Sequence, residues 1–156
     1  MAAFEYRQAA EIRDGLHRHG VQYLFIGKSG AILLGFPDTT QAVDLFVKRG
    51  YENCRAMNAA LLELGFSLTQ TQTAEIEQGK SLIQLKSGPF DLDLVFAPDG
   101  IERFDDAWER RVEVEGFPVC HPDDIIASSE AAHRQKDRET LPRLRAFRDY
   151  WLSKNR

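Results

Sequence analysis

The sequence predicts a single α/β domain in which a mixed, twisted sheet is flanked by helices. Short apolar runs of strand length alternate with longer segments whose apolar residues recur at helical spacing. The 156 residues are 43% apolar and 28% charged, which is ordinary for a globular domain with its own core. There are no internal repeats, low-complexity tracts or linkers, so residues 1–156 are expected to form one domain.

The first half of the chain is expected to begin with an amphipathic helix that stops at Gly20. A buried strand, a short apolar helix and a second strand should follow, and then a helix that ends at Gly65. The expected ranges are a helix over 2–18, a strand over 21–26, a helix over 30–34, a strand over 42–47 and a helix over 51–64.

The second half is expected to contain a strand over 66–70 and an exposed polar turn up to Gly79. Two strands over 81–85 and 90–96 should form a hairpin, because a Gly-Pro turn separates them. A helix over 101–111, short strands over 112–114 and 118–120, and a helix from Pro122 come next. In the last helix, Pro142 should lie in the first turn or at a kink.

Bulk composition excludes several classes of protein. The net charge of −4 does not favour a general electrostatic attraction to nucleic acid. Cys54 and Cys120 lack zinc-type spacing and are too few for a disulfide framework, so we expect two free thiols. No signal-like segment or bilayer-length apolar run occurs, and we therefore expect a cytoplasmic protein without a membrane partner.

Two expected strands carry acidic residues within apolar runs, namely Asp44 in the first and Asp91 and Asp93 in the second. Side chains alternate along a strand, so Asp91 and Asp93 share a face. If the strands are neighbours, Asp44 can converge with one of them. Carboxylates in such a pair, together with substrate phosphates, suit Mg²⁺. The alternative is that these residues lie on a solvated face of the sheet.

The turn Gly27-Lys28-Ser29-Gly30 follows the first strand and precedes an apolar helix. Backbone N–H groups at such a helix start can hold a phosphate, and Lys28 can add a charge. The sequence is not a P-loop, because Gln22 stands where the earlier glycine is required. The alternative is a tight turn with an exposed lysine.

In this order, the motifs resemble those of the minimal nucleotidyltransferase superfamily, whose fold is shared with the catalytic domain of DNA polymerase beta. Gly27 matches the first glycine of the family's turn, while Lys28 replaces the second. Residues 31–35 match the apolar helix, and Thr40 to Asp44 match the acidic Thr-x-Asp-x-Asp motif except at Ala42. Asp93, with Asp91 as its rival, matches the third carboxylate.

A later segment extends the resemblance to about Leu144. Residues 119–126 match its opening, and Arg134, Lys136 and Asp137 match its end, while Ser129 replaces the family lysine. The resemblance implies that Mg²⁺ assists transfer of a nucleoside monophosphate from a nucleoside triphosphate to an acceptor, which is an RNA, a protein or a small molecule. The residues it implies are Asp44 and Asp93 for catalysis, Asp44, Asp93 and Asp91 for the metal, and Gly27, Lys28, Ser29, Gly30 and Thr40 for the nucleotide.

Ala42 removes one expected metal ligand. An alternative function is therefore a catalytically degenerate module that binds a nucleotide or a partner, such as a component of a toxin–antitoxin pair.

The basic residues around 134–148 are interpreted as a solvated helical face, with a phosphate or RNA cradle as the alternative. Phe147 and Trp151 should pack against other helices; an exposed aromatic row would instead provide a homo-oligomer contact. His121 is expected to precede a helix as its cap.

Overall fold

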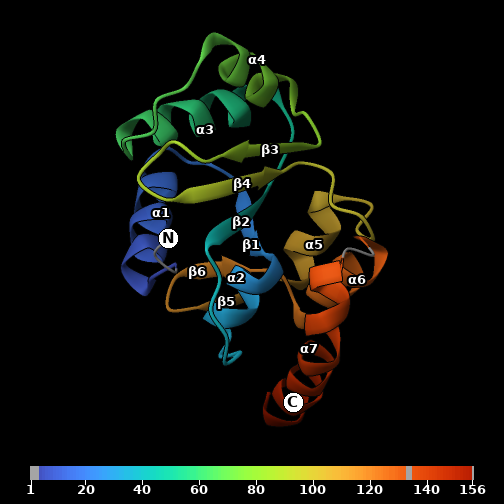
Figure 1. The fold of residues 1–156 in the computed structure, drawn as a ribbon. Helices are drawn as coiled ribbons and strands as arrows, with labels where there is room; N and C mark the ends of the chain where they lie inside the picture. The colour runs from blue at the N-terminus through green and yellow to red at the C-terminus, as the bar shows by residue number, and fades with distance from the viewer. Residues whose placement is uncertain (1–3, 133–134, 156) are drawn as a thin grey trace.

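The computed structural model describes residues 4–132 and 135–155 of the chain. Over these residues the protein is α/β, with seven helices around an open, six-stranded mixed sheet (Figure 1). The predicted fold class is therefore confirmed.

The sheet has the order β3-β4-β2-β1-β6-β5. Neighbouring strands are parallel in the pairs β2–β4 and β1–β6 and antiparallel in the other three pairs. The predicted hairpin is present as β3 and β4. The strands are β1 (Tyr23–Ile26), β2 (Ala42–Val47), β3 (Leu82–Leu85), β4 (Asp91–Val95), β5 (Val112–Val114) and β6 (Phe117–Val119).

Helices surround the sheet on several sides. In Figure 1, α3 and α4 lie together at the top, α1 lies on the left, and α5 and α6 lie on the right. Helix α7 follows α6 and carries the C-terminus away from the sheet. The helices are α1 (Tyr6–Arg18), α2 (Gly27–Leu33), α3 (Tyr51–Glu63), α4 (Gln70–Gln78), α5 (Phe104–Arg110), α6 (Pro122–Ala132) and α7 (Gln135–Lys154).

The central strands bury one face completely. Val43 and Leu45 of β2 and Leu92 and Leu94 of β4 are at most 1% exposed. On the opposite face, Phe46 packs edge-on against Phe104 of α5, with ring centroids 5.0 Å apart. Helix α5 therefore covers part of the second face.

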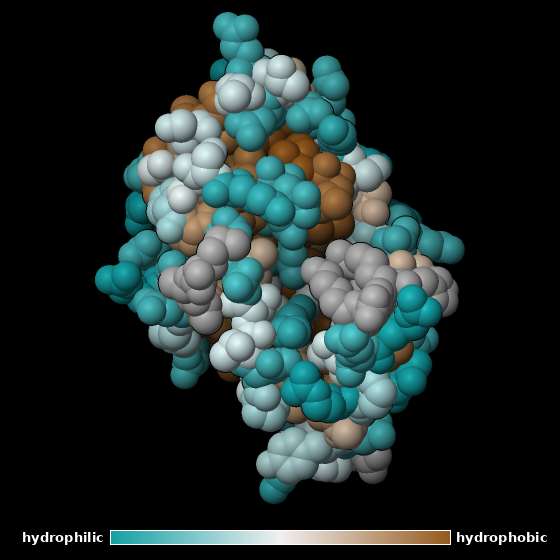
Figure 2. All heavy atoms as spheres, in the orientation of Figure 1, coloured by the Kyte–Doolittle hydropathy of each residue, from teal (hydrophilic) through white to brown (hydrophobic). Residues whose placement is uncertain are grey.

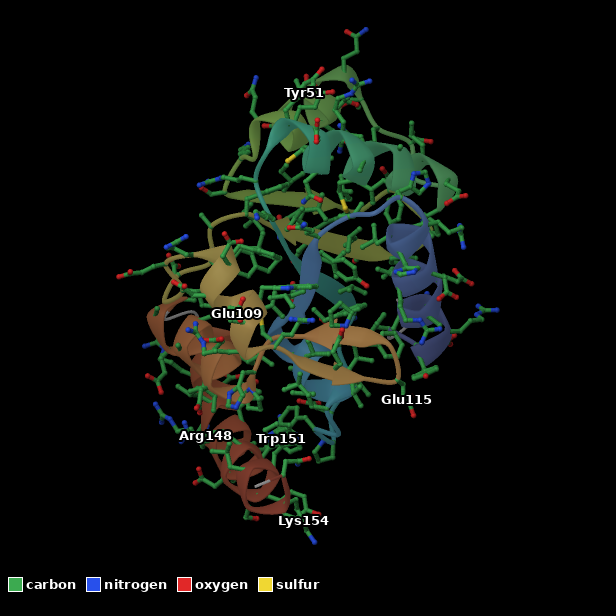
Figure 3. The ribbon with its side chains drawn as sticks, turned by 180° about the vertical axis from the view of Figure 1, so that it is seen from behind. Tyr51, Glu109, Glu115, Arg148, Trp151 and Lys154 are labelled. Carbon is green, nitrogen blue, oxygen red and sulfur yellow. The ribbon has the colours of Figure 1, made fainter. Side chains whose placement is uncertain are left out.

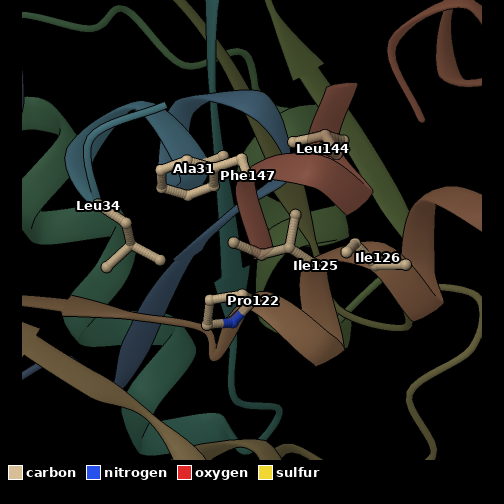
Figure 4. Close-up of a pocket in the computed structure, with 7 residues that line it drawn as sticks. All are labelled: Ala31, Leu34, Pro122, Ile125, Ile126, Leu144 and Phe147. Carbon is tan, nitrogen blue, oxygen red and sulfur yellow. The ribbon is translucent and has the colours of Figure 1, made fainter. Parts of the chain in front are cut away.

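Helices α2, α6 and α7 meet in a packed apolar junction (Figure 4). The space left between them is only about 10 Å³, which is at the lower limit for one water molecule, so this junction is core rather than a ligand site. It is lined by Ala31, Leu34, Pro122, Ile125, Ile126, Leu144 and Phe147.

The prediction of a strand over 66–70 and a polar turn up to Gly79 is wrong. Residues 66–69 have no regular structure, and the Thr/Gln-rich stretch forms α4. The Thr69 hydroxyl accepts from the Gln72 backbone N–H, while the Gln72 side chain accepts from the Thr69 N–H, both at 3.0 Å. This capping box starts a helix that is anchored by one buried side chain, Ile76.

Two other helices differ in detail from the prediction. Helix α2 begins at Gly27 rather than Gly30, so the Gly-Lys-Ser-Gly segment is the first turn of the helix itself. Pro142 is inside α7, past its first turn. The expected cap at His121 is confirmed, because its Nδ1 accepts from the Asp123 backbone N–H at 3.0 Å at the start of α6.

The last helix uses its aromatic residues for packing, as predicted. Phe147 contacts the ring of Phe36 and Trp151 contacts His121, with centroids 5.6 and 5.5 Å apart. Cys54 and Cys120 are free and buried.

The surface in Figure 2 divides into two regions. Hydrophobic side chains show in the upper half, where Figure 1 places β3 and β4, and hydrophilic ones predominate around α7. Within the described residues, none of the helices has the length and apolar character needed to cross a bilayer.

Candidate functional site

The acidic residues lie on paired strands. Strands β2 and β4 run parallel, and the register places Asp44 beside Asp93 and Ala42 beside Asp91. Residues directly paired across two strands point to the same face, and neighbouring strands are about 4.8 Å apart. All four positions are half-exposed, whereas the residues between them are buried. The two strands therefore present two rows of side chains on one accessible face.

Gly27 closes one side of this acidic face. It follows β1, whose last residue, Ile26, pairs with Asp44. Its φ of 67° belongs to the left-handed region that favours glycine. A Cβ at this position would collide with the Asp44 carboxylate, whose Cγ would be 3.1 Å away. Both its conformation and its contact with Asp44 therefore require glycine at position 27.

Ser29 and Gly30 hold the site together from inside the protein. The buried Ser29 hydroxyl donates to the Ile26 carbonyl and accepts from the Asp44 N–H, both at 3.0 Å. A Cβ on Gly30 would lie 3.0 Å from the carbonyl oxygen of Phe25. These two residues, which we predicted as nucleotide contacts, join α2 to β1 and β2.

Lys28 is directed toward the loop after α2. Its Nζ lies 3.3 Å from Oδ2 of Asp38, and Nη2 of Arg143 in α7 lies 2.8 Å from the same oxygen. The Thr39 backbone N–H donates to the other carboxylate oxygen at 2.8 Å. The Thr39 hydrogen bond, followed by those from Arg143 and Lys28, lowers the pKa of Asp38 below its usual value. Asp38 is thus a stable anion that links α7 to the start of α2.

Thr40 shapes the entry into β2. Its hydroxyl donates to the Ala42 carbonyl at 3.3 Å, and its carbonyl accepts from the Phe4 N–H at 2.7 Å. Its position supports the acidic strand directly.

The donor set for a cation is small. Across residues 4–132 and 135–155, no three His, Cys, Asp or Glu side chains are grouped so that they could hold a metal ion together. Mg²⁺ commonly uses one or two carboxylates and completes its shell with water and substrate phosphates. The adjacent pair of Asp44 and Asp93 could supply the one or two carboxylates that such a Mg²⁺ site needs.

Basic residues of α7 are paired with acidic ones in the described part of the chain. Arg145 contacts Glu130 at 3.0 Å, and Arg148 contacts Asp149 at 3.0 Å and Asp123 at 3.4 Å. These pairs agree with the interpretation of α7 as a solvated helical face. The side chains of Arg134, Lys136 and Asp137 lie outside the described residues.

Sequence reasoning missed Asp38, which lies between the predicted helix over 30–34 and the predicted strand over 42–47. The local sequence did indicate that its carboxylate is held in place, because an Asp in a turn readily accepts hydrogen bonds from the next backbone N–H groups. The partner Arg143 is 105 residues away along the chain and could not be identified from local pattern.

Comparison with protein-family models finds no match, and comparison with curated proteins finds no matching relative. The function must therefore be argued from the site itself.

Proposed function

We propose that this protein is a nucleotidyltransferase-like enzyme that uses Mg²⁺ to transfer a nucleoside monophosphate from a nucleoside triphosphate to an acceptor. The observation that carries this proposal is the placement of Asp44 beside Asp93 on parallel strands. Both side chains are half-exposed and lie on the same face of neighbouring strands. A divalent cation held by two such carboxylates would offset the repulsion between their like charges, which favours a cation-dependent role.

The residues have distinct roles in this proposal. Asp44 and Asp93 hold the ion, which neutralises charge on the phosphates during transfer when it is bound. Ser29 positions Asp44 by fixing its backbone N–H. Gly27 leaves room for the Asp44 carboxylate. Lys28 of α2, which is paired with Asp38, can exchange that contact for a phosphate tail.

Asp91 can compensate for the carboxylate that is missing at Ala42. The two residues are paired across β2 and β4, so Asp91 brings a carboxylate into the row where the resemblance expects an acid on β2. Each row of the face thus contains at least one carboxylate. This arrangement supports weak metal-dependent activity rather than none.

The test is a calorimetric titration of Mg²⁺-ATP, GTP, CTP and UTP into the parent chain and the Ala42→Asp variant. We expect Ala42→Asp to bind Mg²⁺-nucleotide more tightly and to increase Mg²⁺-dependent transfer, because it adds a carboxylate beside Asp91. Asp44→Asn should abolish both, and Asp99→Asn, in an exposed turn, is the matched control. If Ala42→Asp leaves affinity and turnover unchanged, the proposed site is wrong.

A second candidate is a non-catalytic module that binds a nucleotide or a partner, as in a toxin–antitoxin pair. Ala42 favours it, because it removes a carboxylate from the expected acidic motif. Nucleotide binding that persists in Asp44→Asn, without turnover in the parent or in Ala42→Asp, would support this candidate instead.

A further inference from the structure

A second site opens where the sheet separates between β1 and β6. The two strands are joined by a single pair, Phe25 with Val119. On the N-terminal side of that pair, a cavity of about 310 Å³ lies between α1, α5 and the β5–β6 hairpin. Figure 3 shows this side of the molecule, with α1 and α5 flanking the hairpin whose turn carries Glu115. This volume falls within the range of small-molecule sites.

The cavity has an apolar floor and a polar rim. Its apolar and aromatic wall is formed by Val21, Tyr23, Trp108 and Pro118, and its polar side chains come from Arg13, Asp14, His17 and Glu113. Apolar walls with a few polar groups are typical of sites that bind small organic molecules.

The charges around the cavity cancel. Nε of Arg13 lies 2.9 Å from Oδ1 of Asp14, and Nε of Arg111 lies 3.6 Å from Oε1 of Glu113. Apart from His17, the lining and its partners therefore have no net formal charge. Because a charged ligand would be desolvated there without a free counter-ion, the cavity favours an uncharged one.

One buried hydrogen-bond donor of the cavity wall has no hydrogen-bond partner among the described residues. Tyr23 lines the cavity and is 4% exposed, and its buried hydroxyl makes no hydrogen bond within that part of the chain. Beside it, the Arg111 guanidinium lies 3.8 Å from the centroid of Trp108 and is paired with Glu113. Burial raises the pKa of Tyr23, so its hydroxyl keeps its proton at neutral pH. A ligand with an acceptor oxygen would satisfy such donors.

We propose that this cavity binds a small uncharged aromatic molecule that carries an amide-type carbonyl. The ring lies against the apolar wall, and the carbonyl oxygen accepts from the Tyr23 hydroxyl. The ligand reaches that hydroxyl by moving Asp14 or Glu113, whose side chains are 55% and 53% exposed at the rim. The amide N–H groups then donate to these carboxylates. This site is separate from the acidic face and does not depend on the proposed activity.

The test compares three probes of one size and different charge: benzamide, benzamidine and benzoate. Each is titrated into ¹⁵N-labelled protein while backbone amide shifts are recorded. Benzamide should shift the signals of Tyr23, Glu113 and Gly116 and bind at least about tenfold more tightly than either charged probe. Shifts elsewhere, or tighter binding of benzamidine or benzoate, would overturn the proposal.

The Tyr23→Phe variant tests the hydroxyl directly. It should fold, because the ring keeps its edge contact with Phe25 and the missing hydroxyl had no partner. Benzamide should bind about fivefold more weakly, as loss of one hydrogen bond implies. Tyr150→Phe, on the exposed face of α7, is the matched control and should bind as the parent does. Unchanged affinity in Tyr23→Phe would contradict the proposal.

Discussion

The two faces of β2 and β4 differ sharply in burial. Leu45 and Leu94 on one face are completely buried, whereas Asp44 and Asp93, one residue earlier on each strand, are half-exposed on the other. The same backbone hydrogen bonds hold both sets of side chains in register. A change of one position along the strand therefore separates residues that stabilise the fold from residues available for chemistry.

The largest expected effect lies on the buried face. Leu94→Ala should lower the free energy of unfolding by about 3 kcal/mol, because it removes buried methyl groups and leaves a cavity. Val95→Ala, one position further along β4 and half-exposed, should cost less than about 1 kcal/mol. Urea unfolding monitored by circular dichroism measures both. Equal losses in the two variants would mean that the two faces contribute equally to the free energy of unfolding.

The next effect concerns the contact between Gly27 and Asp44. Gly27→Ala should destabilise the protein by about 2 kcal/mol, because it strains a left-handed residue and displaces the carboxylate. Gly20→Ala is a matched control, since Gly20 has nearly the same φ but no atom within 4 Å of its Cβ position. Gly20→Ala should cost about 1 kcal/mol and keep nucleotide binding. Identical behaviour of the two variants would exclude a role for close packing against Asp44.

A smaller change of opposite sign is expected on the acidic face. Asp93→Asn should raise the free energy of unfolding by about 0.5 kcal/mol without added Mg²⁺, because it removes a like charge directly beside Asp44. Thermal unfolding at low ionic strength measures the difference. A loss of stability in Asp93→Asn would show that Asp93 is a structural residue.

An effect of equally small size, and dependent on pH, is expected at Asp38. Because its pKa is lowered in the folded protein, the ionised form stabilises the fold above the ordinary aspartate value, and this contribution disappears as pH falls through the lowered pKa. Asp38→Asn should cost about 0.5 kcal/mol at pH 7 and progressively less as the pH falls below the ordinary aspartate value. Urea midpoints across that range test it, and a difference that persists in acid would point to a cause other than charge.

Much of this architecture follows from local pattern. Alternation of apolar and acidic residues predicts both faces of β2 and β4, and it predicts that Asp91 and Asp93 share one of them. The apolar strand before Gly27 and the Gly-Pro turn of the β3–β4 hairpin were also readable from sequence.

The remaining features depend on contacts between distant residues. Helix α4 was missed because its polar composition hides a capping box at Thr69 and a single buried anchor, Ile76. The structural role of Ser29 requires the carbonyl of Ile26 and the N–H of Asp44 to meet, which depends on how α2 packs. The cavity beside Tyr23 exists because β1 and β6 separate, and strand separation has no local signal.

We propose that Asp44 and Asp93 jointly hold a divalent cation in the presence of a nucleoside triphosphate. Substoichiometric Mn²⁺, a paramagnetic substitute for Mg²⁺, can be added to ¹⁵N-labelled protein with ATP, and the amide signals broadened by the ion can then be identified. We expect selective broadening at Asp44, Asp93 and Gly27, and its loss in Asp44→Asn. Broadening confined to exposed acids such as Asp99, or an unchanged pattern in Asp44→Asn, would contradict it.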